Sequence, residues 1–350
     1  MKKHLLPALF IIFLIGYFTY RQVDKKRIIV VDNVGQGQQE KVYASTISID
    51  YLRSLNIDAK APETIEELTP GSNYKRYIVS YISEGNKIHG LLTVPNENPP
   101  EGGYSAVVFN HGYIPPNQYV TTEKYVAYVD YLARNGFVVF KIDMRGNGDS
   151  EGMPIGSYFS PGYTVDAISA LKSLQKLDYV NKDRIGIWGH SMAGNLVLRA
   201  MLVEDEVKAG VIWAGAVYSY EDFAEYRLND GSYVRRGNDP HYDTRALNRG
   251  VSSEITKLRE NPKEVNYTSG FWKEASLTSN INYLNFPVQL HHATNDPTVN
   301  VGYSRDLEKV LKENNKQYEY YEYSGGGHNI DSPYFEQAMQ RTVEFFKTNL

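Results

Sequence analysis

The sequence predicts an α/β fold in which a mostly parallel central sheet carries helices on both faces. Short apolar runs rich in β-branched residues, at 106–109, 136–142 and 185–188, alternate with segments of helical spacing. The chain has 350 residues, 42% of them hydrophobic, which is enough for one large domain plus an appendage. The net charge of −4 gives no reason to expect a nucleic-acid partner. Because Cys is absent, disulfides, thiolate chemistry and Cys-ligated metals are excluded.

Residues 1–27 are predicted to form a signal anchor or transmembrane segment. Lys2 and Lys3 precede an almost wholly apolar run at 5–20, and further basic residues follow it. The run is short for a spanning helix, which needs about 20 residues, but flanking basic side chains extend it by snorkelling. Since no A-x-A-like cleavage site is evident, we expect an uncleaved membrane anchor with the following domain outside the cytoplasm. Secretion after signal cleavage is the alternative.

Residues 28–72 are predicted to be a linker and N-terminal extension, to which no chemistry is assigned. Within them, 47–55 reads as a strand or short helix, and 62–70 is acidic and turn-rich. The main domain is expected to span 73–350. It begins with a hairpin over 74–94, because Tyr77, Val79 and Tyr81 alternate with polar residues and a second strand-like run at 88–94 follows Glu84-Gly85-Asn86.

The stretch at 183–202 reads as strand, tight turn and helix, which is the context of a nucleophile elbow. Ser191 lies at the turn and is the predicted nucleophile. The usual pattern is G-x-S-x-G, whereas here the fifth position is Ala193, followed by Gly194. The helix that begins near Met192 points its N–H groups at the charge that forms when Ser191 attacks.

The strand at 106–109 runs into Asn110-His111-Gly112-Tyr113. Hydrolases with such an elbow place an oxyanion-hole N–H at this kind of strand end. We therefore expect the backbone N–H groups of Tyr113 and Met192 to hold the oxyanion. Gly112 lets the backbone approach the substrate closely. His111 is interpreted as a structural residue of the loop.

A helix is expected at 125–134, followed by a strand at 136–142 that ends in a Gly-rich loop at 143–152. The loop lacks the spacing of a phosphate-binding motif. Asp143 and Arg145 are interpreted as a structural ion pair that holds this loop. A further helix at 166–177 leads to the elbow strand.

After the elbow helix, a strand is expected at 209–217, and the alternating pattern is then interrupted over 220–277. That polar insertion has helical stretches at 252–260 and 271–275. An insertion of this length in an α/β unit is more often functional than not. We therefore expect a helical lid.

The alternating pattern then resumes to the end of the chain. Its expected elements are a strand at 286–292, a helix at 304–314, a strand at 317–323 and a helix at 332–350.

Two candidate site residues follow the last two strands. Asp296 lies in the loop after 286–292, and His328 ends a Gly-rich loop after 317–323. Active sites of open α/β sheets lie at such strand ends. His291 and His292 lie in or at the end of a strand and are interpreted as packing residues.

The chain order Ser191, Asp296, His328 is the Ser-Asp-His order of a hydrolase triad. Ser191 would attack a carbonyl carbon, and His328 would take its proton and pass it to the leaving group. Asp296 would fix the imidazole tautomer and stabilise the imidazolium.

From about residue 74 to 350 the chain resembles an α/β-hydrolase of the prolyl oligopeptidase-like group. The motifs that carry the resemblance are KIHGLLTVP, NHGY, DMRGNGDSEG, GHSMAG, HHATNDPTV and SGGGH, in that order. The resemblance implies a serine hydrolase that cleaves an ester or peptide bond without a cofactor, and we expect no metal site. The group's peptidases usually carry a β-propeller before the catalytic domain, and we expect none in these residues.

Four functions are compatible with these observations. The first is a serine peptidase acting on short peptides or acyl-peptides, and the second is a carboxylesterase with the same triad. A non-catalytic anchored binding protein is disfavoured because Ser191, Asp296 and His328 are all present. A metal-dependent hydrolase is disfavoured because no H-E-x-x-H or similar ligand motif occurs.

Overall fold

A computed structural model describes residues 46–350 except 155, 227 and 229–248. The anchor predicted at 1–27 and the first part of the linker lie outside these residues. Among the described residues, no helix combines the length and apolar character that crossing a bilayer requires.

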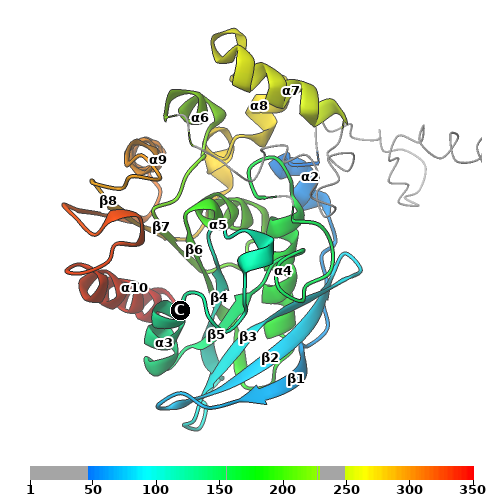
Figure 1. The fold of residues 1–350 in the computed structure, drawn as a ribbon, viewed down its shortest axis with the longest axis vertical. Coiled ribbons are helices and arrows are strands. Elements are labelled where there is room, and N and C mark those ends of the chain that lie inside the picture. Colours follow the sequence, from blue (N-terminus) through cyan, green and yellow to red (C-terminus); the bar gives the residue numbers. More distant parts are fainter. Residues whose placement is uncertain (1–45, 155, 227, 229–248) are drawn as a thin grey trace, which may run out of the picture. The chain divides into compact units, whose positions relative to one another are not determined.

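The described strands form one nine-stranded sheet, in the order β1-β2-β3-β5-β4-β6-β7-β8-β9 (Figure 1). Strands β1, β2, β3 and β5 pair antiparallel, and β4 to β9 pair parallel with their neighbours, with β4 between β5 and β6. The mostly parallel sheet is therefore confirmed. The strands are β1 (Glu63–Leu68), β2 (Tyr74–Ser83), β3 (Asn86–Pro95), β4 (Tyr104–Asn110), β5 (Val138–Ile142), β6 (Val180–His190), β7 (Ala209–Trp213), β8 (Val288–Ala293) and β9 (Tyr318–Tyr323).

Helices cover both faces of the sheet, as predicted. Alternate strand residues point to opposite faces. Val108 and Ile187 join the apolar cluster that contains α4 and α5, whereas Val107 and Trp188 join the cluster that contains α3 and α10. The helices are α2 (Ile49–Ser54), α3 (Val126–Arg134), α4 (Gly162–Leu174), α5 (Met192–Val203), α6 (Tyr220–Tyr226), α7 (Arg249–Glu260), α8 (Gly270–Ala275), α9 (Gly302–Glu313) and α10 (Phe335–Asn349), with 3-10 turns η1 (Pro116–Gln118), η4 (Pro262–Glu264), η5 (Thr278–Tyr283) and η6 (Gly327–Asn329).

Residues 46–72, which the sequence analysis assigned to a linker and extension, belong to the same compact unit as the sheet. Ser48 caps α2 by accepting a hydrogen bond from the backbone N–H of Tyr51. Ile49 and Leu52 on this helix are buried, and Arg53 donates to the carbonyl of Leu202 at 2.8 Å. Strand β1 extends the sheet by pairing with β2.

The insertion expected at 220–277 contains α6, α7 and α8, and 227 and 229–248 lie outside the described residues. Trp272 and Ala275 of α8 are buried in the main apolar cluster. Tyr220 and Phe223 of α6 pack on Phe159, with ring centroids 5.4 and 6.0 Å apart. The insertion is thus anchored to the domain at both ends.

We predict that Leu52→Ala lowers the free energy of unfolding by about 2–5 kcal/mol, because it opens a cavity where α2 packs on the core. Ile65→Ala is the matched control, since Ile65 is 53% exposed on β1, and its effect should stay below about 1 kcal/mol. Urea denaturation measures both changes. Equal small losses would show that α2 is a dispensable appendage.

Candidate active site

Ser191 joins β6 to α5 with no further residue between them. Its backbone has φ 57° and ψ −121°, a conformation that L-residues rarely adopt. The turn is held from both sides, since Ser191 N–H donates to the carbonyl of Trp213 at 2.8 Å and Gly194 N–H donates to that of Ser191 at 2.9 Å. The strained strand-to-helix turn expected of an elbow is therefore present, with Met192 as the first residue of α5.

Close packing around this turn requires small residues. A Cβ on Gly189 would lie 2.6 Å from Val197 and 2.7 Å from the carbonyl oxygen of Ala193. A Cβ on Gly194 would lie 2.6 Å from the Cα of Gly215. Ala193 itself is fully buried. Alanine at the fifth position of the motif is thus compatible with the turn.

The loop after β4 passes directly over Ser191. A Cβ on Gly112 would lie 3.1 Å from Ser191 Cβ, 3.2 Å from His190 Nδ1 and 2.8 Å from the Tyr125 hydroxyl. Only glycine allows this approach without a shift of its neighbours. The Gly112-Tyr113 segment is therefore beside Ser191, where an oxyanion donor is expected from the sequence.

Asp296 and His328 meet across the loops that follow β8 and β9. His328 Nδ1 lies 2.8 Å from Asp296 Oδ2, and Gly327 N–H donates to the Asn295 side chain at 3.0 Å. The His328 ring also lies 4.5 Å, centroid to centroid, from the ring of His190, which precedes Ser191. The three residues predicted as a triad thus follow the carboxyl ends of β6, β8 and β9.

The Asp296 carboxylate is fully buried and well supplied with hydrogen bonds. Oδ1 accepts from the backbone N–H groups of Thr298 and Val299 at 2.7 and 2.9 Å. Burial alone would raise the pKa of Asp296, but hydrogen bonds from His292 and His328, followed by the charge of His328 and the Val299 N–H, hold that pKa well below its usual range. Asp296 is therefore ionised and able to orient the His328 imidazole.

His292 approaches the same carboxylate, which the sequence analysis did not anticipate. It is buried, as expected of a packing residue, but its Nε2 lies 3.3 Å from Asp296 Oδ2 and 3.0 Å from the carbonyl of Val299. Its Nδ1 lies 2.7 Å from Ser304 Oγ. The one hint in the sequence is that His292 lies only four positions before Asp296, at the end of the strand that leads into the Asp296 loop.

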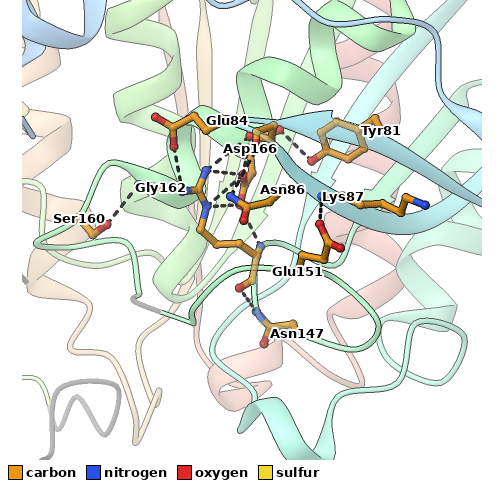
Figure 2. Close-up of polar contacts among 11 residues, drawn as sticks. Tyr81, Glu84, Asn86, Lys87, Asn147, Glu151, Ser160, Gly162 and Asp166 are labelled. Atoms are coloured by element: carbon orange, nitrogen blue, oxygen red, sulfur yellow. Dashed lines mark hydrogen bonds and ion pairs between the residues drawn. The ribbon is translucent and has the colours of Figure 1, made fainter. Parts of the chain in front are cut away.

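The predicted ion pair between Asp143 and Arg145 is wrong. Arg145 instead pairs with Asp166 of α4 at 2.7 Å and with Glu84 of the β2–β3 turn at 2.8 Å (Figure 2). Asp143 accepts hydrogen bonds from the hydroxyls of Tyr119 and Thr121. Although Asp143 and Arg145 are close in sequence, their side chains have different partners. Arg145 pairs with Asp166 because that carboxylate is buried in α4 and needs a counter-ion.

Three of the buried histidines, His111, His190 and His291, are kept neutral. Burial lowers the pKa of His111 to about 4, and it lowers the pKa values of His190 and His291 to about 3. His111 stacks on Tyr119 and faces the carbonyls of Gly112 and Asp143, in agreement with a structural role. His328 differs from them in its exposure, because 19% of its side chain is accessible to solvent.

A shallow, solvent-open hollow lies beside Met192, the residue that follows Ser191. It includes Tyr113 and Met192, the two residues whose N–H groups were expected to hold an oxyanion. None of its described lining residues carries a carboxylate or a basic group other than the neutral His111. The lining consists of His111, Tyr113, Ile114, Pro116, Asn147, Pro154, Gly156, Tyr163 and Met192.

Known proteins resemble this chain in both sequence and structure. The family described as "Serine aminopeptidase, S33" matches residues 104–331. A Bacillus subtilis (strain 168) protein described as "Uncharacterized peptidase YtmA" is 28% identical over 283 residues, which cover 80% of this chain and 96% of that protein.

Two solved structures illustrate the similarity of fold. The acylaminoacyl peptidase of Pyrococcus horikoshii superimposes with a TM-score of 0.61 at 18% identity, over 80% of this chain and 42% of that one. An acetyl xylan esterase from a Paenibacillus species superimposes with a TM-score of 0.60 at 19% identity, over 85% of this chain and 91% of that one. At these identities the likeness shows the fold alone, and it confirms the predicted fold class.

The buried histidines give a test of pH dependence. In the unfolded chain His291 has a pKa near 6.5, so between about pH 6.5 and pH 3 the unfolded state binds one more proton there than the folded state. The folded wild type therefore loses about 1.4 kcal/mol of stability at this residue for each pH unit below 6.5. The stability advantage of wild type over His291→Gln should shrink by that amount per unit, as measured by urea denaturation between pH 7.5 and 5. A constant difference would contradict the neutral, buried state of His291.

Proposed function

Because the chain belongs to the serine aminopeptidase S33 family of α/β-hydrolases, we propose that it hydrolyses a peptide or acyl-peptide bond through an acyl-enzyme on Ser191. The chain is a serine hydrolase of the peptidase and esterase type. The observation that carries the finer proposal is the hydrogen bond of 2.8 Å between His328 and the ionised Asp296, next to the strained turn at Ser191.

This geometry supports the following proposed mechanism. His328 donates its Nδ1–H to Asp296, which leaves Nε2 as the nitrogen that accepts the Ser191 proton. Ser191 Oγ bonds to the substrate carbonyl carbon, and the carbonyl oxygen gains the negative charge. His328 then gives the proton to the leaving group as its bond to carbon breaks. Water repeats both steps on the acyl-enzyme, releases the acid and restores Ser191.

Two backbone donors are proposed to hold the oxyanion. Met192 N–H lies at the N-terminus of α5, where the helix dipole favours negative charge. Tyr113 N–H lies in the loop that crosses Ser191. The Gly112 N–H is committed to the Tyr125 hydroxyl at 2.8 Å and is not part of this proposal. Donors placed where charge develops are usually the largest electrostatic contribution to such reactions.

A carboxylesterase with the same triad is the second candidate. The hollow lined by Tyr113 and Met192 has no carboxylate among its described lining residues, so these residues offer no counter-ion to a free amino group. An uncharged lining suits an acyl or N-blocked substrate. A panel of p-nitrophenyl esters, aminoacyl arylamides and N-acetylated aminoacyl arylamides separates the candidates by their kcat/KM values.

We predict that Ser191→Ala and His328→Ala each lower kcat by about 10⁴-fold or more, and that the double variant is hardly worse than either single. Asp296→Asn should lower kcat by about 10⁴-fold because it leaves the imidazole in the wrong tautomer. A fluorophosphonate should label wild type at Ser191 and leave Ser191→Ala unlabelled. His291→Gln is the control and should keep its kcat. Near-normal hydrolysis by purified Ser191→Ala would overturn the triad.

We also propose that the insertion at 220–277 acts as a lid that sets specificity. Supporting this, α6 packs through Tyr220 and Phe223 on Phe159, a few residues after Pro154 and Gly156 of the hollow. Phe223→Ala should therefore change the kcat/KM ratio of long to short acyl esters by about tenfold, while p-nitrophenyl acetate is affected far less. Leu52→Ala, a core truncation in α2, is the control. An unchanged substrate ranking in Phe223→Ala would contradict the lid.

We further propose that residues 1–27 anchor the protein in a membrane with the catalytic domain outside the cytoplasm. The support is the basic start followed by the apolar run at 5–20. A chain that begins at Gln36 should be soluble and as active as the full chain, which should sediment with membranes. Full-length protein in the soluble fraction, with its N-terminus intact by mass spectrometry, would rule out the anchor.

A further inference from the structure

Tyr125 and His190 connect the loop beside the nucleophile to the loop that carries His328. The Tyr125 hydroxyl accepts a hydrogen bond from Gly112 N–H at 2.8 Å and lies 2.7 Å from His190 Nδ1. On the other side of the ring, His190 Nε2 lies 2.9 Å from the carbonyl oxygen of His328. Three hydrogen bonds thus run in series between two loops that the proposed mechanism requires.

The direction of each of these bonds is determined. A carbonyl only accepts, so Nε2 of His190 carries the proton that faces His328. Because burial and the neighbouring His328 lower the pKa of His190 to about 3, the ring is neutral and its Nδ1 carries no proton. The Tyr125 hydroxyl must therefore donate to Nδ1 and accept from Gly112. Burial raises the pKa of Tyr125, which keeps that hydroxyl protonated.

The surroundings hold both side chains in place. Tyr125 stands at the start of α3 with φ 58°, and its ring packs against Phe109 and Tyr128 with centroids 5.6 and 5.5 Å apart. His190 is 3% exposed and lies over Trp188. A polar network whose members are all satisfied in one arrangement is rigid.

We propose that Tyr125 and His190 are positioning residues of this enzyme, which hold the Gly112-Tyr113 segment and the His328 loop at one separation around Ser191. The inference rests on the proposed triad, because the two positioning residues would bring an oxyanion donor and the base His328 to the same substrate carbonyl. Misplacement of reacting groups by about 1 Å costs on the order of 100-fold in rate. Neither side chain touches the substrate in this proposal.

The test compares Tyr125→Phe, His190→Asn and the double variant with wild type. Tyr125→Phe keeps the ring and removes only the hydroxyl, whereas His190→Asn leaves nothing at the position of Nε2. We expect each single variant to lower kcat by about 10- to 100-fold with little change in KM. The double variant should be no less active than the less active of the two single variants. Affinity for a peptide boronic acid, which forms a tetrahedral adduct with the nucleophile, should fall by the same factor as kcat/KM.

Tyr74→Phe is the matched control. Tyr74 belongs to the apolar cluster against which Tyr125 packs, and its hydroxyl donates to Asp130 at 2.8 Å, away from Ser191. It should keep wild-type kcat. Rates are divided by the fraction of enzyme that a fluorophosphonate titrates, so loss of folded protein is not counted. If Tyr125→Phe does not fold, the kcat and the boronic acid affinity of His190→Asn alone test the positioning role.

The outcomes distinguish this inference from the proposed function. Activity in Ser191→Ala overturns the triad, and the positioning role with it. An inactive Ser191→Ala combined with kcat within about twofold of wild type in Tyr125→Phe and His190→Asn overturns the positioning role alone. Losses that multiply in the double variant, or boronic acid affinity that stays at the wild-type value, also overturn it.

Discussion

The structure depends on one backbone constraint, the passage from β6 to α5 through the single residue Ser191. A non-glycine residue at φ 57° persists only where its surroundings over-determine it, at a cost of order 1–3 kcal/mol. Here every residue of α5 is buried, so the helix has one position against the sheet. Gly194 and Gly215 allow its first turn to approach the strand that follows it, and the Trp213 carbonyl holds the Ser191 N–H. The packing of α5 against the sheet therefore requires the strained turn at Ser191.

Helix α5 is also where distant parts of the chain attach. Arg199 is fully buried, donates to the carbonyl of Ile47 at 2.7 Å and lies 3.4 Å from the carbonyl of Ala275. A buried guanidinium needs such acceptors, since leaving it without them would be costly. The segment before β1 and the insertion before β8 are therefore both hydrogen-bonded to the helix that begins directly after Ser191. This explains why 46–72 belongs to the domain rather than to a linker.

The sequence pattern predicts the order of the elements and the positions of Ser191, Asp296 and His328, because strand ends and Gly-rich turns are local features. It does not predict partners that lie far apart in the chain. Strand β1 was missed because its residues are acidic and exposed at the sheet edge, with no apolar alternation to reveal them. Arg145 was assigned to its neighbour Asp143, whereas its partner Asp166 is 21 residues away on a helix. Tyr125 and His190 had no signal at all, since their connection exists only in three dimensions.

Buried polar groups near the site have a common role that follows from the sheet. The carboxyl ends of the parallel strands bring several loops to one edge, and each loop carries backbone groups that need partners. Lys141 of β5, which is fully buried, donates to the carbonyls of Thr121 and Lys124, and Asp143 accepts from Tyr119 and Thr121. This holds the segment that leads into Tyr125, whose hydroxyl in turn holds the loop beside Ser191. Apolar packing alone would fix the sheet and its helices but would leave such loops free to move. The cost of burying a lysine and a carboxylate is therefore offset by a site whose loops have a single arrangement.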